Sequence, residues 1–221
     1  MVSLRRSHLR LLAPAAEPGA LPSEPPAPDD DALLAGLERR EPTAAAAFYD
    51  RARPIVDRTL SRLLGARDPD YEDVAQAALY ELIQTLKRFR QECPLDAWLS
   101  IVTARVAYRE IRRRRLQRRL FGTAPEDVLA LDPVAMPVPF AARQAVERIR
   151  AHLARMNDKR AWTFVLHDAY GYSLAQIAQI MDTSVSAAQS RLVRGRREIH
   201  ERIAADPALA CFFDDWSEEG P

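Results

Sequence analysis

Four arginines lie close together in the last quarter of the sequence, and a run of small and amide side chains precedes them. The arginines are Arg191, Arg194, Arg196 and Arg197, and the preceding residues are Ser186, Ala187, Gln189 and Ser190. A guanidinium pairs with phosphate, a Gln amide can form two hydrogen bonds with adenine, and an Ala methyl can contact the methyl group of thymine. Residues of these types in this order predict contact with duplex DNA, in which the arginines supply affinity and the smaller side chains read bases.

The segment 172–203 must position these side chains, and its pattern predicts two short helices separated by a tight turn. Ser173 and Gln176 form a capping box, Ser184 is an N-cap for the second helix, and Asp182 between them tolerates a left-handed conformation. The expected inward positions are Leu174, Ile177, Ala178, Met181, Val185, Ala188, Leu192 and Ile199. This pattern is typical of a helix-turn-helix whose second helix enters a major groove. The alternative is a solvated basic helix that only packs on its neighbour.

A second basic segment runs from Arg105 to Arg119, where Glu110 is the only acidic residue. A basic helix that carries an aromatic ring can hold a single strand by neutralising phosphates and stacking on bases. The candidate residues for this role are Arg105, Tyr108, Arg109, Arg112 and Arg113. Two alternatives stay open, because Tyr108 and Trp98 can be ordinary core aromatics and the arginine run can be a helix end that frays into a linker.

The helix expected over residues 71–89 has a different character. It begins with acidic residues, which favour the positive end of the helix dipole, and its middle is polar. Such a face repels nucleic acid and suits a protein partner, which would contact Asp73, Gln76 and Leu79. On spacing alone, an amphipathic helix with one solvated side explains the pattern equally well.

The chain as a whole is predicted to be all-α, with two small helical domains joined by a flexible linker. Ala, Leu, Arg and Glu dominate the 221 residues, and strand-like alternation is scarce. Proline-rich composition predicts a disordered extension over residues 1–29 and a linker over residues 120–139. The helical domains are then residues 30–119 and 140–205.

Within the first domain, helices are expected from Asp29–Asp31 onward, from Pro42 to Gly65, over residues 71–89 and over residues 95–119. Residues 206–221 form a tail in which Phe212, Phe213 and Trp216 stand among acidic residues. This tail either docks on the body of the protein or binds a partner, and we favour docking.

Several classes of function find no support in the sequence. Cys93 and Cys211 stand far apart and the four histidines show no ligand spacing, so we expect neither a disulfide nor a metal site. No nucleophile–base pair, phosphate-binding loop or cofactor motif is recognisable, so we expect a protein that is not an enzyme and needs no cofactor. No apolar run approaches membrane-spanning length, so we expect a protein without membrane contact. The net charge of +1 says little, but the separation of basic from acidic segments predicts separate surfaces for an anionic partner and a different one.

The order of these parts resembles the extracytoplasmic function (ECF) sigma factors, bacterial RNA polymerase sigma factors built from a sigma-2 domain, a linker and a sigma-4 domain. In residues 30–119 the resemblance rests on the terminal arginine run and on Glu72, Asp73, Val74, Gln76, Phe89, Arg90, Glu92 and Ala97–Leu99. In residues 140–203 it rests on Ser173, Ile177, Ala178, Val185, Ser190, Arg191, Leu192, Arg194 and Arg196. The chain departs from the family pattern at Ala77, residues 102–105, Arg109, Ala187 and Gln189.

The resemblance implies a role for each surface. The helix with Asp73, Gln76 and Leu79 would bind the clamp helices of the largest polymerase subunit. The helix over residues 105–113 would open and hold the promoter −10 element, and the helix that begins at Val185 would read the −35 element while its domain rests on the polymerase flap. The resemblance also implies a location in the bacterial cytoplasm, with core RNA polymerase and promoter DNA as partners and an anti-sigma protein as a further candidate.

Two other interpretations fit the same residues. The chain can be a transcription regulator of another class, which binds duplex through residues 172–203 and a protein or ligand through residues 30–119. It can also be a degenerate sigma-like protein that binds polymerase or an anti-sigma protein without starting transcription.

Overall fold

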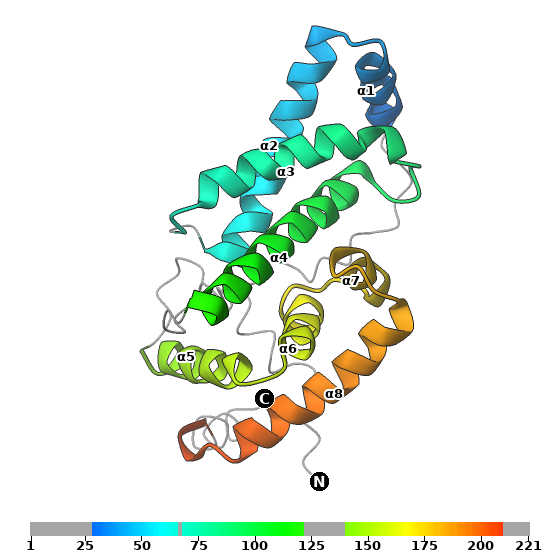
Figure 1. Cartoon of the computed structure of the whole chain (residues 1–221). Coiled ribbons are helices and arrows are strands. Elements are labelled where there is room, and N and C mark those ends of the chain that lie inside the picture. The colour runs from blue at the N-terminus through cyan, green and yellow to red at the C-terminus, as the bar shows by residue number, and fades with distance from the viewer. Residues whose placement is uncertain (1–27, 66–67, 122–139, 210–221) are drawn as a thin grey trace, which may run out of the picture. The chain divides into compact units, whose positions relative to one another are not determined.

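The computed structural model of the chain describes residues 28–65, 68–121 and 140–209, and every regular element within these ranges is a helix (Figure 1). The predicted all-α fold is therefore confirmed. The described helices fall into two units, which we treat separately. The first holds α1 (Pro28–Glu38), α2 (Pro42–Leu64), α3 (Tyr71–Thr85), the short 3-10 helix η2 (Leu86–Arg88) and α4 (Leu95–Phe121). The second holds α5 (Phe140–Ala154), α6 (Asp158–Phe164), the π-helix η3 (Val165–Ala169), most of α7 (Leu174–Ile180) and α8 (Val185–Ala204).

The helices of the first unit begin and end where the sequence predicts, within two residues or so. Pro42 stands in the first turn of α2, where its missing N–H costs nothing. Gly65 ends the helix with a φ of 85°, which glycine adopts without strain, and its N–H bonds the carbonyl of Ser61. The helix predicted over residues 71–89 is α3 followed by η2, and α4 continues to Phe121, past its predicted end.

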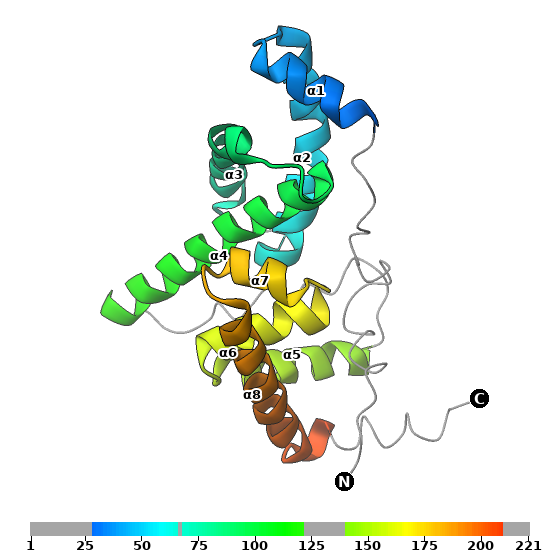
Figure 2. The same ribbon diagram turned by 90° about the vertical axis from the view of Figure 1, so that its right-hand side faces the viewer.

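The core of the first unit lies where α2, α3 and α4 pack on one another, and α1 lies beside the N-terminal end of α2 (Figures 1 and 2). The fully buried large side chains here are Leu60, Leu82, Leu95 and Leu99. Arg51 connects α2 with α1 and α4, because it pairs with Asp30 of α1 and Asp96 of α4. Asp30 is buried, so this pair ties the first described helix to the bundle.

The second unit is built around Trp162 and Leu166, with α6 packed on α8 and α5 beside both (Figure 1). Gly195 of α8 faces the backbone of α6 so closely that a Cβ placed on it would lie 3.0 Å from the carbonyl oxygen of Arg160. A larger residue at 195 would therefore push α8 away from α6. The spacing of residues in the sequence gives no signal for this role of Gly195.

One residue predicted to face inward is exposed, since 48% of Val185 is open to solvent. This prediction is wrong because Val185 is the first residue of α8 and the buried side of that helix begins at Ala188. The predicted linker and most of the two predicted terminal segments (residues 1–27, 122–139 and 210–221) lie outside the described residues.

No helix in the described part of the chain combines the length and the apolar character that a membrane crossing requires.

Candidate nucleic-acid and partner interfaces

The helix-turn-helix forms as the sequence predicts. The Ser173 N–H donates to the side-chain oxygen of Gln176 at 2.8 Å, and the Gln176 N–H donates to the Ser173 hydroxyl at 3.2 Å, which completes the capping box of α7. The Ser184 hydroxyl accepts from the Ala187 N–H at 3.2 Å and caps α8. Asp182 adopts a φ of 51°, so the predicted left-handed turn residue is confirmed.

The turn is closed by a backbone bond from the Thr183 N–H to the Ala178 carbonyl at 2.9 Å, as in a Schellman motif. Ile177 and Ala178 of α7 and Met181 just after it are buried, and so are Ala188, Leu192 and Ile199 of α8. These six inward positions are confirmed, and Leu174 is half-buried. They fix which side of α8 faces outward.

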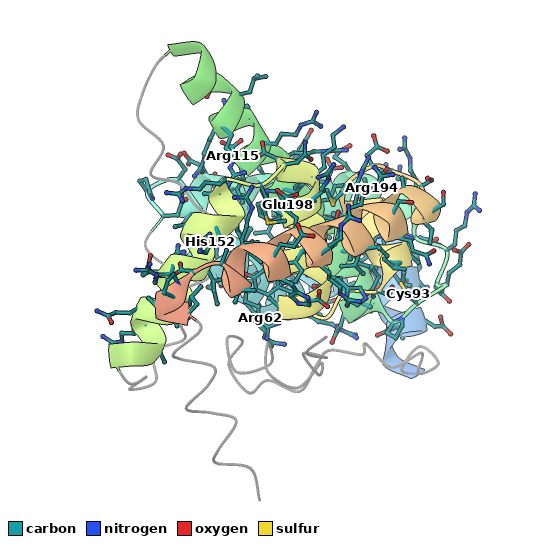
Figure 3. The ribbon with its side chains drawn as sticks, turned by 90° about the horizontal axis from the view of Figure 1, so that it is seen from below. Arg62, Cys93, Arg115, His152, Arg194 and Glu198 are labelled. Atoms are coloured by element: carbon teal, nitrogen blue, oxygen red, sulfur yellow. The ribbon has the colours of Figure 1, made fainter. Side chains whose placement is uncertain are left out.

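The outward side of α8, which we call the α8 outer face, carries most of the side chains predicted to contact duplex. Its exposed members are Val185, Ser186, Gln189, Ser190, Val193, Arg194 and Arg197. Ala187 and Arg191 are half-buried at its edge. Figure 3 shows Arg194 and Glu198 on α8, one turn apart.

Arg194 makes no ion pair with any of the described residues, and the nearest carboxylate to Arg197 is Glu201 at 3.9 Å. These guanidinium groups are available to a ligand. Val193, 63% exposed in the middle of this face, was missed in the sequence analysis. Its spacing of four residues from both Gln189 and Arg197 was the signal that places it there.

Arg196 differs from the other arginines of α8. Its side chain reaches back to η3, where Nε donates to the carboxylate of Asp168 at 2.8 Å, a second nitrogen donates to the other oxygen, and His167 Nδ1 lies 3.2 Å away. This bidentate pair holds α8 against η3. The predicted contact of Arg196 with DNA is therefore corrected to an internal one, since its guanidinium is already engaged.

The electrostatics of this pair favour both charged forms. Burial pushes the pKa of Asp168 upward, but the hydrogen bonds from Arg196 and His167 outweigh burial and leave that pKa below its usual value. The hydrogen bond to Asp168 raises the pKa of Arg196. The ion pair is thus fully formed at neutral pH.

On the opposite side of the same helix, Glu198 accepts a hydrogen bond from Arg160 of α6 at 3.0 Å and pairs with Arg202 at 3.1 Å. Burial raises the pKa of Glu198, and the bonds from Arg160 and Arg202 lower it further than burial raises it. Together with the close approach of Gly195 to Arg160, these pairs seat α8 on α6.

The arginines predicted to hold a single strand lie on α4, and most of them are paired within the first unit. Arg105 donates to Glu81 of α3 at 3.0 Å, Arg109 lies 3.8 Å from the same carboxylate, and Arg113 pairs with Glu110 at 2.7 Å. Arg112 is exposed and forms no ion pair within the described ranges.

Arg114, which was not among the predicted site residues, is well enclosed by carboxylates. Its side chain is 12% exposed and contacts Asp68, Asp70 and Glu110, at distances of 2.8, 3.1 and 3.0 Å. It therefore fastens the chain between α2 and α3 to α4. Burial acts to lower the pKa of Arg114, and its carboxylate partners more than offset this and raise it.

The predicted stacking role of Tyr108 is corrected by its burial. Only 6% of Tyr108 is exposed, so its ring belongs to the core and offers no face to a base. Trp98 is half-buried and packs on Phe89, with ring centroids 5.1 Å apart. This contact holds the segment after η2 against the start of α4, and Gln91 in that segment turns with a φ of 56°.

The outward side of α3, which we call the α3 outer face, carries the residues predicted to bind a protein partner. Asp73 and Gln76 are exposed and Leu79 is half-buried. Tyr80 and Ile83, missed in the sequence analysis, are 66% and 61% exposed beside them. Exposed aromatic and aliphatic side chains at helical spacing beside acidic and amide groups are typical of a protein-binding helix.

Within the described ranges, no three His, Cys, Asp or Glu residues are grouped so that they could hold a metal ion.

Comparison with known proteins matches both units to the same family. The family model described as Sigma-70 region 2 matches residues 48–117, and the one described as Sigma-70, region 4 matches residues 146–199. The two matched ranges together cover more than half of the chain. They contain the α3 outer face, most of α4 and the exposed arginines of α8.

Similar curated proteins include the ECF RNA polymerase sigma factor SigJ of Mycobacterium tuberculosis, which is 34% identical over 124 residues. That match covers 51% of this chain but only 36% of SigJ, so the chain spans about a third of that relative's length. The RNA polymerase sigma factor CnrH of Cupriavidus metallidurans is 26% identical over 152 residues, which is 66% of this chain and 80% of CnrH.

Two solved structures are also similar. One is the sigma factor RpoE in complex with the anti-sigma factor NepR from Bartonella quintana, with a TM-score of 0.49, 19% identity, and coverage of 73% of this chain and 97% of that one. The other is CnrH in complex with the cytosolic domain of CnrY, with a TM-score of 0.48, 21% identity, and coverage of 80% and 98%. From the two family matches and the curated relatives, the chain belongs to the sigma-70 family of RNA polymerase sigma factors, in its ECF group.

Proposed function

We propose that this chain directs RNA polymerase to promoters, and that it does so with three surfaces. The α3 outer face binds core polymerase, the exposed arginines of α4 hold the separated strand of the −10 element, and the α8 outer face reads the −35 element as duplex. The domains responsible are residues 30–119 and 140–205. The observation that carries the proposal is the α8 outer face, because it presents exposed arginines, with no ion pair closer than 3.9 Å among the described residues, beside small polar side chains on the second helix of a capped helix-turn-helix.

Duplex reading by α8 divides between two kinds of side chain. Arg191, Arg194 and Arg197 contact phosphates, which costs little because Arg194 and Arg197 break no close ion pair on binding. Ser186, Ala187, Gln189 and Ser190 lie toward the N-terminal half of α8, the part of a recognition helix that meets base edges. Val193 adds an apolar group that can contact a thymine methyl. Arg196 contributes as a positioning residue, through Asp168.

Among the arginines of α4, Arg112 is the first candidate for contact with the separated DNA strand. Its side chain is exposed and has no internal ion pair within the described residues. Arg105, Arg109 and Arg113 contribute after exchanging part of their contact with Glu81 or Glu110 for phosphate. That exchange lowers the net gain of each contact, since the carboxylate loses its partner. We therefore rank Arg112 above the others.

Polymerase binding by α3 combines polar and apolar contacts. Asp73 and Gln76 supply charge and hydrogen bonds. Tyr80 and Ile83, with Leu79, supply apolar surface that would be buried on binding. Burial of exposed Tyr and Ile side chains is worth roughly 25 cal/mol per Å² of apolar surface. The resemblance implies that the partner helices belong to the clamp of the largest subunit, and that an anti-sigma protein competes for such surfaces.

Transcription in vitro with bacterial core polymerase tests the proposal. A sigma factor yields a promoter-specific runoff product that is absent when the chain is omitted. A library of DNA templates with varied upstream sequences identifies the promoter. A helix-turn-helix regulator of another class yields no product without a second sigma factor. A degenerate sigma-like protein binds core polymerase, which gel filtration detects, and still yields no product.

Double variants show which surface the runoff product depends on. Arg194→Ala with Arg197→Ala should abolish runoff while leaving core binding unchanged, and Tyr80→Ala with Ile83→Ala should weaken core binding. Arg143→Ala is the matched control, because Arg143 is an exposed arginine of α5 in the same unit as α8 and lies outside the proposed surfaces. Normal runoff from the Arg194/Arg197 variant would exclude the proposed role of α8.

A further inference from the structure

The α8 outer face carries more than a phosphate-binding surface needs. Beside Arg194 and Arg197 lies the aliphatic side chain of Val193, which is 63% exposed, and Val185 in the first turn of the helix is 48% exposed. Phosphates bind the arginines but do not cover Val193, which DNA covers only where a thymine methyl meets it. A face that places an exposed valine next to two arginines is complementary to a peptide rich in carboxylates and aromatic rings, since aromatic rings pack on both guanidinium planes and valines.

A segment of that composition belongs to the same chain and lies outside the described residues. Residues 210–221 read A-C-F-F-D-D-W-S-E-E-G-P, with no lysine or arginine. Their acidic and aromatic members are Asp214, Asp215, Glu218, Glu219, Phe212, Phe213 and Trp216. The charge is opposite to that of the α8 outer face, and the aromatic rings match its valines.

The described residues just before this segment are held in place at the C-terminal end of α8. Asp206 accepts two hydrogen bonds from Arg148 of α5, at 2.9 and 3.1 Å, lies 2.7 Å from His152, and caps the Ala208 N–H at 3.1 Å. Leu209 is fully buried. Leu209, the last described residue, is therefore a fixed point on the second unit, the unit that also contains α8.

The distances allow contact within this unit. An extended chain advances roughly 3.3 Å per residue, so Asp215 reaches about 20 Å from Leu209 and Glu219 about 33 Å. Along α8, Arg194 lies about 15 Å from Ala204 at 1.5 Å per residue, and the helix is about 10 Å across. The carboxylates can therefore pass around the helix and still reach Arg197 and Arg194.

We propose that residues 210–221 dock on the α8 outer face, with their carboxylates on Arg194 and Arg197 and their aromatic rings on Val193, and that they compete there with DNA. The competition rests on the proposed function of α8, whereas the docking does not. A short tether gives an effective concentration on the order of 1 mM, so a segment that binds with a Kd of about 0.1 mM would weaken duplex binding about tenfold.

Removal of the segment tests the competition. A chain that ends at Ala210 keeps Asp206 and Leu209, so the second unit should stay folded. Its affinity for a short fluorescent duplex, measured by anisotropy at low salt, should rise three- to tenfold above that of the full chain. Its affinity should also fall more steeply with salt, because the carboxylates no longer occupy the arginines in place of phosphates. An unchanged affinity would overturn the proposal.

A charge-preserving variant separates docking from simple repulsion of DNA by acidic residues. Replacement of Phe212, Phe213 and Trp216 by alanine keeps all the carboxylates, so repulsion predicts no change in duplex affinity. Docking predicts a gain of about two- to fivefold, because the aromatic contacts with the α8 outer face are lost. No gain from this variant would contradict docking.

A synthetic peptide of residues 210–221 provides a readout without DNA. Labelled peptide should bind the chain that ends at Ala210 at low salt, lose binding to the Arg194→Ala/Arg197→Ala form, and keep it with Arg143→Ala. Equal binding to all three forms, or none, would overturn the docking. If the peptide binds as expected and no form of the chain binds any duplex, the docking stands and the proposed DNA role of α8 fails.

Discussion

The arginines of α4 and α8 look alike in the sequence, yet the fold uses them differently. On α4, Arg105, Arg113 and Arg114 are paired with carboxylates of their own unit, and only part of the run is open to a ligand. On α8 the division is sharper, since Arg196 is engaged with Asp168 whereas Arg194 forms no ion pair within the described part of the chain. An arginine run therefore contains two kinds of residue. We call those open to a ligand binding arginines, and those paired with carboxylates of their own unit building arginines. Only the presence or absence of a carboxylate partner distinguishes the two kinds.

The largest effect is expected from Arg114→Ala, which removes a building arginine. Three carboxylates, Asp68, Asp70 and Glu110, would lose their shared partner, so we expect the first unit to lose about 2–3 kcal/mol of stability, allowing for partial screening. Hydrogen exchange followed by mass spectrometry reports each unit separately and should show faster exchange in α3 and α4 only. Unchanged exchange would mean that Arg114 does not stabilise the first unit and belongs with Arg112 among the binding arginines.

The next effect is expected from Arg194→Ala with Arg197→Ala, which removes two binding arginines. Duplex affinity at low salt should fall about tenfold or more, and the salt dependence should flatten by about two counterions, because each arginine neutralises one phosphate. Thermal stability should change little, since among the described residues Arg194 forms no ion pair and Arg197 lies 3.9 Å from Glu201. Loss of stability without loss of affinity would reverse the assignment of these two residues.

Asp168→Asn probes the building arginine of α8. The amide cannot pair with Arg196 as the carboxylate does, so we expect the second unit to lose about 1–2 kcal/mol after allowance for the partial exposure of Arg196. Duplex affinity should fall as a consequence, because α8 is less firmly seated. Chemical denaturation and duplex titration of the same sample measure both effects.

The pH dependence of stability gives a further test of the Asp168–Arg196 ion pair. The pKa of Asp168 is lowered from its usual 3.8, so the folded state binds fewer protons than the unfolded state in acid. The stabilisation is therefore complete above pH 3.8 and is lost as the pH falls below that value, through the lowered pKa of Asp168. The difference in stability between the wild-type chain and Asp168→Asn should shrink over this acidic range, and a constant difference would contradict the ion-pair explanation.

The smallest effect is expected from Arg112→Ala, which tests the binding arginine of α4. Affinity for a single-stranded or premelted −10 segment should fall a few-fold, about 1 kcal/mol or less, because one exposed phosphate contact is lost. Stability should be unchanged, in contrast to Arg114→Ala two residues away. If Arg112→Ala destabilised the first unit instead, the division between binding and building arginines on α4 would not hold.

Much of the fold could be predicted from residues that act locally. Proline at 42, glycine at 65, the Ser173–Gln176 capping box, Ser184 and the left-handed Asp182 each specify a helix end through their own backbone or hydrogen-bonding preferences, and all of them do so in the structure. Such signals span four residues or fewer. They do not depend on what packs against the helix.

The remaining features depend on partners far away in the sequence. Tyr108 lies in the core and Tyr80 and Ile83 lie outside because of how α2, α3 and α4 meet, and spacing within one helix left both outcomes open. Likewise, the sequence by itself determined that α8 is a capped helix rich in arginine, whereas only the tertiary structure decided that Arg196 turns inward to Asp168, 28 residues earlier in the chain. The physical reason is that helix propensity and capping are local energies, while burial and ion pairing arise from contacts between elements that the chain brings together only on folding.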